Sequence, residues 1–182
     1  MTRGAVIWLT GLPSSGKSTL AAAAHARLIE CGVASCILDS DILRAILAPQ
    51  AGYGQLERAA FYETLGRLAA ELAAQGLLVL VPATANRRHY REKARRAAPA
   101  FLEVWVATSL DECRKRDAKG LYRRAERGEL RDFPGVTSEY QPPETPDLTV
   151  TSSDSPAVEQ IIELARELNL RGTNGALASK EH

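Results

Sequence analysis

Ala5-Val-Ile-Trp-Leu-Thr-Gly-Leu-Pro-Ser-Ser-Gly-Lys-Ser-Thr19 is the stretch that decides the fold of this chain. Its first five residues form a short apolar run, which is typical of a buried strand. The pattern Gly11-x4-Gly16-Lys17-Ser18 follows at once, and the alanine-rich residues 20–29 after it are good helix formers. Strand, glycine loop and helix in this order are the context in which the pattern predicts a P-loop, a loop that binds phosphate groups.

The residue types of this loop suit a nucleoside triphosphate. Glycines allow consecutive backbone N–H groups to turn inward around a phosphate, and the start of a helix adds partial positive charge. We expect Lys17 to reach the β- and γ-phosphates of ATP and the Ser18 hydroxyl to bind Mg²⁺. A glycine turn before an ordinary helix is the alternative, and the complete pattern with both flanks favours the nucleotide site. The predicted nucleotide-binding residues here are Gly11, Ser14, Ser15, Gly16, Lys17, Ser18 and Thr19.

Length and composition predict an ordinary globular protein. We expect residues 1–171 of the 182 to form one domain and the small, polar residues 172–182 to form a disordered tail. The net charge of +1 argues against a nucleic-acid or acidic-membrane partner. No apolar run approaches the roughly 20 residues that span a bilayer. The N-terminus lacks the apolar segment of a signal peptide, so we expect a cytoplasmic protein.

Cysteine usage points to core thiols. Cys31, Cys36 and Cys113 are odd in number and form no Cys-x-x-Cys pair. A disulfide or a metal site built on cysteine is therefore the less favoured interpretation.

An acidic pair follows the second predicted strand, residues 35–38. In open α/β sheets the chemistry lies beyond the carboxyl ends of the strands, so we expect Asp39 near Mg²⁺ and Asp41 near an acceptor hydroxyl. The alternative is that one of the two only caps a helix beginning at Ile42. Arg44 lies about one helical turn further along, where it could clamp an anionic substrate or remain a solvated surface residue.

The rest of the chain alternates strands with helices. A helix over residues 55–75 carries apolar residues, among them Leu65, Leu68, Ala69 and Leu72, on one face. Further strands are predicted at residues 77–81, 101–106 and 148–151, and further helices at residues 87–97, 109–115 and from 155 onward. Ser109 is the expected N-cap of the helix over 109–115. This alternation predicts the α/β class, with a parallel five-stranded sheet flanked by helices, as in the small-kinase branch of P-loop NTPases.

Residues 116–141 differ from the rest in composition. They are dense in cations at first and then rich in aromatic residues, proline and glycine. Long irregular stretches in compact domains are commonly lids or binding loops. We therefore expect a basic lid that closes over the triphosphate, excludes water and stabilises the charge of the transferring phosphoryl group.

Several stretches together carry a family resemblance over residues 5–168. They are Cys113-x-x-Arg116-Asp117-x-Lys119-Gly120-Leu121-Tyr122, Phe133-x-Gly135, Tyr140-x-x-Pro143-Glu144 and Asp39-Ser-Asp41-Ile-Leu-Arg44. On them the sequence resembles the adenylylsulfate (APS) kinase family of sulfate assimilation. The resemblance implies Mg²⁺-dependent transfer of phosphate from ATP to the 3′-hydroxyl of adenosine 5′-phosphosulfate (APS), which gives 3′-phospho-APS (PAPS). Because the family often dimerises, it also implies a homodimer.

The resemblance further implies roles for individual residues. Asp41 would approach the acceptor hydroxyl, with Asp39 close to the metal. Tyr53 would stack on the substrate adenine and Phe133 on its other face. Among the cations, Arg44, Arg58 and Arg88 would hold the phosphosulfate, and Lys119 with lid arginines such as Arg116 would shield the transition state.

The sequence also departs from the family pattern around the acceptor. Phe61 stands where the family usually has an asparagine, Ser40 and Ile42 replace a glycine and an asparagine, and residues 83–86 read Ala-Thr-Ala-Asn instead of roughly Phe-Ile-Ser-Pro. Three hypotheses follow: an APS kinase, a kinase of the same architecture acting on another small anionic acceptor, and a nucleotide-binding regulatory subunit without turnover. Retention of Lys17 together with the acidic pair argues against the last.

Overall fold

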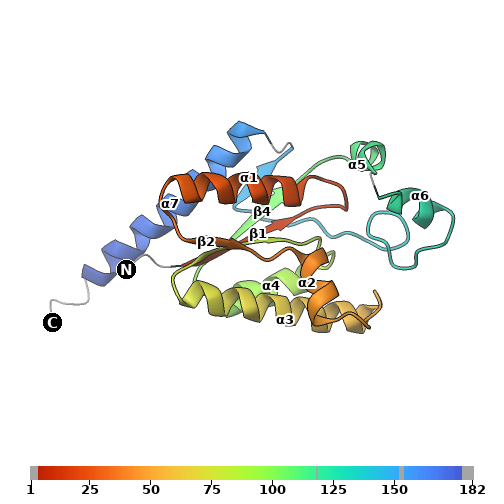
Figure 1. Ribbon diagram of the computed structural model, residues 1–182, viewed down its shortest axis with the longest axis horizontal. Helices are drawn as coiled ribbons and strands as arrows, with labels where there is room; N and C mark the ends of the chain where they lie inside the picture. The colour runs from red at the N-terminus through yellow and green to blue at the C-terminus, as the bar shows by residue number, and fades with distance from the viewer. Residues whose placement is uncertain (1–3, 118, 152–153, 178–182) are drawn as a thin grey trace.

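The computed structural model describes residues 4–117, 119–151 and 154–177, in which five parallel strands form one sheet between layers of helices (Figure 1). The strands are β1 (Ala5–Thr10), β2 (Ser35–Ile37), β3 (Leu78–Pro82), β4 (Phe101–Val106) and β5 (Leu148–Val150). Their order across the sheet is β2-β3-β1-β4-β5, so the strand that leads into the P-loop is central. The predicted parallel five-stranded sheet is confirmed.

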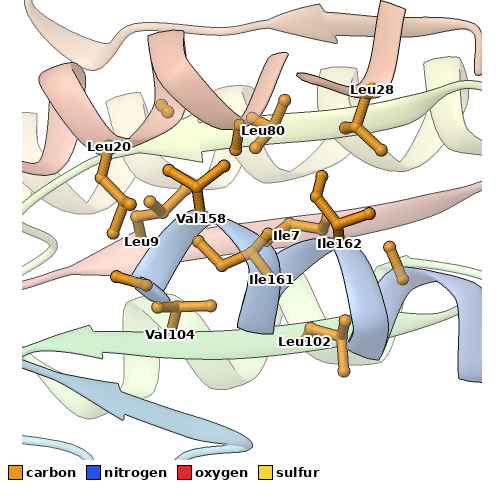
Figure 2. Packing of buried hydrophobic residues seen from close by; sticks show 14 of the residues in the cluster. Ile7, Leu9, Leu20, Leu28, Leu80, Leu102, Val104, Val158, Ile161 and Ile162 are labelled. Atoms are coloured by element: carbon orange, nitrogen blue, oxygen red, sulfur yellow. The ribbon is translucent and has the colours of Figure 1, made fainter. Parts of the chain in front are cut away.

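The central strand is buried on both faces because its residues alternate between two apolar clusters. Ile7 and Leu9 pack with residues of α1 (Lys17–Glu30) and α7 (Ser155–Leu177), as Figure 2 shows. Trp8, on the opposite face of the strand, packs with residues of α3 (Gln55–Ala74) and α4 (Arg88–Ala97). A strand covered on both sides reads as a continuous apolar run, which explains the composition of residues 5–9.

The predicted helices are present, with small shifts at their ends. Leu65 and Ala69 are buried in the α3 interface, and Leu68 and Leu72 pack against it, as predicted. The helix α5 (Leu110–Arg116) begins after Ser109, whose hydroxyl accepts a hydrogen bond from the Glu112 N–H at 3.3 Å, which confirms the N-cap.

Residues 116–141, expected to be irregular, contain a helix and supply most of a small apolar cluster that also includes Cys113. The helix α6 (Leu121–Glu126) begins where the Asp117 carboxylate accepts hydrogen bonds from the N–H groups of Leu121 and Tyr122, at 2.7 and 3.1 Å. Tyr122 is buried edge-to-face against Phe133 and donates a hydrogen bond to the Pro13 carbonyl at 2.9 Å. This segment is therefore packed against the P-loop, at the end of the sheet where Figure 1 shows α5 and α6.

The last element in the described residues is the long helix α7, which lies beside α1. It extends to Leu177 and so includes residues 172–177, the first part of the segment predicted as a disordered tail; the remainder, residues 178–182, lies outside the described residues. All three cysteines are free thiols, and Cys113 is buried. None of the helices in the described part of the chain is long and apolar enough to cross a lipid bilayer.

Candidate active site

A pocket of about 900 Å³ opens beside the P-loop. It lies at the carboxyl end of the sheet, where side chains from the P-loop, α2 (Ser40–Leu47), α3 and the lid converge. It brings together most of the residues singled out from the sequence. Those that line it are Ser14, Gly16, Lys17, Ser18, Thr19, Asp39, Asp41, Arg44, Tyr53, Arg58, Arg116, Lys119 and Phe133.

The P-loop glycines meet two separate steric demands. Gly16 adopts a left-handed conformation (φ 101°) directly before α1, which a residue with a side chain resists. A Cβ atom at Gly11 would lie 2.5 Å from the Val106 carbonyl oxygen, so only glycine fits against β4. Ser15 does not line the pocket but is buried beneath it, and its carbonyl accepts hydrogen bonds from Thr108 at 2.9 Å and Arg116 at 3.4 Å.

Lys17 is buried at the base of the loop. Its ammonium group donates hydrogen bonds to the carbonyls of Gly11 at 3.1 Å and Leu12 at 2.7 Å, and to the Ser15 hydroxyl at 3.4 Å. Burial removes water from the charge and lowers the pKa of Lys17 to about 8, although Asp41 and Asp39 oppose this shift. A polyanion bound nearby would therefore stabilise the charged form of this buried lysine.

The Asp39 carboxylate accepts hydrogen bonds both from the start of α2 and from the P-loop. One oxygen accepts hydrogen bonds from the N–H groups of Asp41 at 2.9 Å and Ile42 at 3.4 Å, so Asp39 is the N-cap of α2. The other oxygen accepts a 2.7 Å hydrogen bond from the Ser18 hydroxyl. Asp39 therefore caps a helix, but that helix begins at Ser40, two residues before the predicted Ile42. Its second carboxylate oxygen faces the P-loop.

The donor atoms of Ser18 and Asp39 fit Mg²⁺. This ion prefers oxygen ligands and usually takes only one or two from the protein, the others coming from phosphates and water. Among the described residues no three His, Cys, Asp or Glu side chains gather to hold a metal ion. A magnesium ion here would depend largely on the phosphates of a bound nucleotide.

Asp41 lies at the mouth of the pocket and contacts the lid. Its carboxylate accepts a 3.0 Å hydrogen bond from the Lys119 ammonium group, and both side chains are exposed. This hydrogen bond with Asp41 is the main cause of a raised pKa at Lys119. The contact joins the residue expected at the acceptor hydroxyl to the cation expected over the phosphates.

Two buried arginines give the pocket positive charge that pairs with no carboxylate in the described part of the chain. Arg58 donates 2.7 Å hydrogen bonds to the carbonyls of Tyr53 and Asp132, and Arg44 donates one of 3.4 Å to Gly52. Within the described residues neither guanidinium forms an ion pair. Because buried charge is costly unless it is paired, this end of the pocket favours an anionic ligand.

Arg88 is not brought into this pocket. It donates to the Pro142 carbonyl at 2.8 Å and forms an ion pair with Glu144, beside a separate cavity of about 390 Å³. Residues 141–144 contact this part of α4: they accept hydrogen bonds from Arg88, at the Pro142 carbonyl and the Glu144 carboxylate, and from Arg91, at the Gln141 carbonyl. The sequence placed Arg88 near the carboxyl end of β3 but could not show which way its side chain turns.

The pocket also contains residues that were not predicted as site residues. Phe61 and Tyr62 of α3, Thr84 after β3 and Leu130 and Arg131 of the lid line it. From the sequence, Phe61 and residues 83–86 were identified only as differences from the family pattern. The position of Thr84, just beyond the carboxyl end of a parallel strand, is the sequence signal that could have identified it.

Comparison with known proteins shows which family the whole chain resembles. The model of the family described as adenylylsulphate kinase matches residues 3–151. The chain is 39% identical to an adenylyl-sulfate kinase of Prochlorococcus marinus, covering 92% of this chain and 86% of the relative. It is also 39% identical to one of Paraburkholderia xenovorans, covering 93% and 96%. The solved structure of the Mycobacterium tuberculosis APS kinase CysC in complex with AMPPNP and APS superimposes with a TM-score of 0.86 at 39% identity, covering 91% of this chain and 99% of that one.

Proposed function

Since this chain belongs to the adenylylsulphate kinase family, we propose that it transfers the γ-phosphoryl group of ATP to the 3′-hydroxyl of APS, giving PAPS and ADP. A bond forms between the 3′-oxygen and the γ-phosphorus, and the bond from that phosphorus to the β,γ-bridging oxygen breaks. Catalysis of such a transfer consists mostly of positioning the two substrates and stabilising charge.

The P-loop supplies the donor site. Backbone N–H groups and Lys17 bind the phosphates, and Arg116, which lines the same pocket, adds positive charge from the lid. Ser18 and Asp39 would hold Mg²⁺, which neutralises charge on the phosphate oxygens when it is bound. Closure of the lid excludes water from the reacting groups.

The opposite wall supplies the acceptor site. Asp41 takes the proton of the attacking hydroxyl or orients that hydroxyl, and Lys119 stabilises the charge that develops on the transferred group. Arg44 and Arg58 bind the phosphosulfate, while Tyr53 and Phe133 are the aromatic surfaces for the adenine. Arg88 has no part in this proposal, because its side chain faces a different cavity.

The observation that carries the proposal is that Asp41 and Lys17 line the same pocket, from α2 and from the P-loop. The test is a coupled assay of the purified chain with MgATP and APS, with PAPS identified directly and Lys17→Met as the inactive control. We expect ADP and PAPS in equal amounts. ADP formation no faster with APS than without it would refute the assignment.

The lining of the pocket also suits an alternative proposal, in which the acceptor is a compound other than APS. Phe61 and Thr84 line it at positions that differ from the family pattern, so the shape of the acceptor wall differs as well. A panel of nucleotide-linked anions and small anionic alcohols in the same assay separates the two cases. A higher kcat/KM for another acceptor than for APS would identify that compound as the substrate. The expected homodimer stays a prediction, which light scattering of the purified chain tests.

A further inference from the structure

Arg44 is packed among aromatic rings at the acceptor end of the pocket. Its guanidinium carbon lies 4.0 Å from the centroid of the Phe61 ring, 4.8 Å from that of Tyr53 and 5.9 Å from that of Tyr62. These distances fall within the range of cation–π interactions. Phe61 is only 4% exposed whereas Tyr53 is 56% exposed, so Phe61 is the ring whose position the core fixes.

The polar contacts of Arg44 are few for a buried cation. Arg44 is 8% exposed, yet it donates only one long hydrogen bond, and the ion pairs of the described residues do not include it. Arg91, which is also buried, donates hydrogen bonds of 2.6, 2.6 and 2.8 Å to the Glu103 carboxylate and to the carbonyls of Ala85 and Gln141. Arg91 thus has one carboxylate and two carbonyls as partners, whereas Arg44 donates to one carbonyl among the described residues.

Stacking and hydrogen bonding use different parts of a guanidinium. The planar face of the group meets an aromatic ring, while the N–H donors project from its edge. A ring that holds the face therefore leaves the donors available to a ligand. It also reduces the side-chain freedom that the arginine would otherwise lose on binding.

We propose that Phe61 is a positioning residue for the acceptor, which holds the guanidinium of Arg44 so that its N–H edge meets the phosphate or sulfate group. This rests on the proposed function, because the anionic acceptor is taken to be APS. Since Phe61 acts through Arg44 on the acceptor, its loss should weaken acceptor binding and leave nucleotide binding and the chemical step unchanged.

The test compares Phe61→Leu and Phe61→Tyr with Phe101→Leu. Phe101 is a matched control, because it is 8% exposed and its ring lies 4.8 Å from the Arg95 guanidinium carbon, away from the pocket. For each protein the Kd of APS is measured by calorimetry with ADP present, and kcat and both KM values are measured by turnover. A fourth protein with pentafluorophenylalanine at position 61 keeps the ring shape but withdraws electron density from its face.

We expect Phe61→Leu and the fluorinated protein to raise the Kd and KM for APS about tenfold, with kcat and the KM for ATP within about twofold of wild type. Phe61→Tyr and Phe101→Leu should bind APS within about threefold of wild type. The proposal is overturned if Phe61→Leu binds APS as wild type does, if it changes the KM for ATP and kcat to the same extent, or if Phe101→Leu has the same effect.

Failure of the proposed function gives a different result. Wild-type protein that binds APS without turning it over would refute the kinase assignment for that acceptor, while the APS affinities of the variants would still decide the role of Phe61. Wild-type protein that does not bind APS at all would overturn both.

Discussion

The carboxylate of Asp41 and the ammonium group of Lys119 lie 3.0 Å apart, although the two residues are 78 positions apart in the sequence. Asp41 belongs to α2, directly after the second strand, and Lys119 belongs to the lid. Because both side chains are exposed, this ion pair contributes little to stability, about 1 kcal/mol at most. The contact brings a carboxylate of α2 and a cation of the lid to the same edge of the pocket.

Asp41→Asn is expected to lower kcat by roughly 10²–10⁴-fold, because the amide cannot accept the proton of the acceptor hydroxyl. The KM for ATP and the melting temperature should change little. Steady-state kinetics and a thermal melt measure these quantities. Asp111→Asn is the matched control, since Asp111 is an exposed carboxylate paired with Arg114 outside the pocket. Turnover of Asp41→Asn at the control's rate would remove Asp41 from the mechanism.

Two substitutions of Asp39 can separate its proposed role in binding Mg²⁺ from its role as the N-cap of α2. Asparagine caps helices as well as aspartate does, so Asp39→Asn should keep α2 intact while raising the Mg²⁺ concentration needed for half-maximal activity. Asp39→Ala should show the same Mg²⁺ effect and lose about 1 kcal/mol of stability as well. Activity titrated against Mg²⁺ and unfolding in urea measure the two effects. An unchanged Mg²⁺ requirement in both variants would argue against a metal at Asp39.

Lys17 should take up a proton when nucleotide binds near pH 8. Burial lowers its pKa in the free protein from the ordinary 10.5 to about 8. The free-energy cost of burying the charged lysine is therefore fully present below pH 8 and disappears as the pH rises from 8 to 10.5. The triphosphate restores the charge, which predicts uptake of about half a proton per site at pH 8 and almost none at pH 6. Calorimetry of MgATP binding in buffers of different ionisation enthalpy measures this. The uptake should vanish in Lys17→Met, and an equal uptake in that variant would contradict the assignment.

Arg91→Met is expected to destabilise the fold by about 3–5 kcal/mol, because it leaves the Glu103 carboxylate buried without its main partner. Their side chains are 2% and 12% exposed, and Arg91 also binds the carbonyls of Ala85 and Gln141. The double variant Arg91→Met/Glu103→Met should be less destabilised than the single one, since no unpaired charge remains. Urea unfolding measures both. A loss below 1 kcal/mol for the single variant would show that Arg95 or water compensates.

The sequence indicated the parts of the site that depend on short stretches of chain. The P-loop is contiguous with its strand and helix, and Asp39 and Asp41 follow within a few residues of the second strand. The helix α6 was missed because Asp117 caps it from four residues upstream of Leu121, within a stretch whose glycines and charges resemble those of a loop. The sequence could suggest a lid there but not the apolar cluster that packs it.

Position along the chain therefore determined which residues are near a strand's carboxyl end, because strand, turn and helix follow from local composition. Tertiary packing decided where their side chains point. Arg44 and Arg88 read alike as cations near such an end, yet one is packed against Phe61 in the pocket and the other is paired with Glu144 in a separate cavity. The two contacts join residues 17 positions apart (Arg44 and Phe61) and 56 positions apart (Arg88 and Glu144). The packing of α2 on α3 creates the first, and the path of residues 139–144 over α4 creates the second.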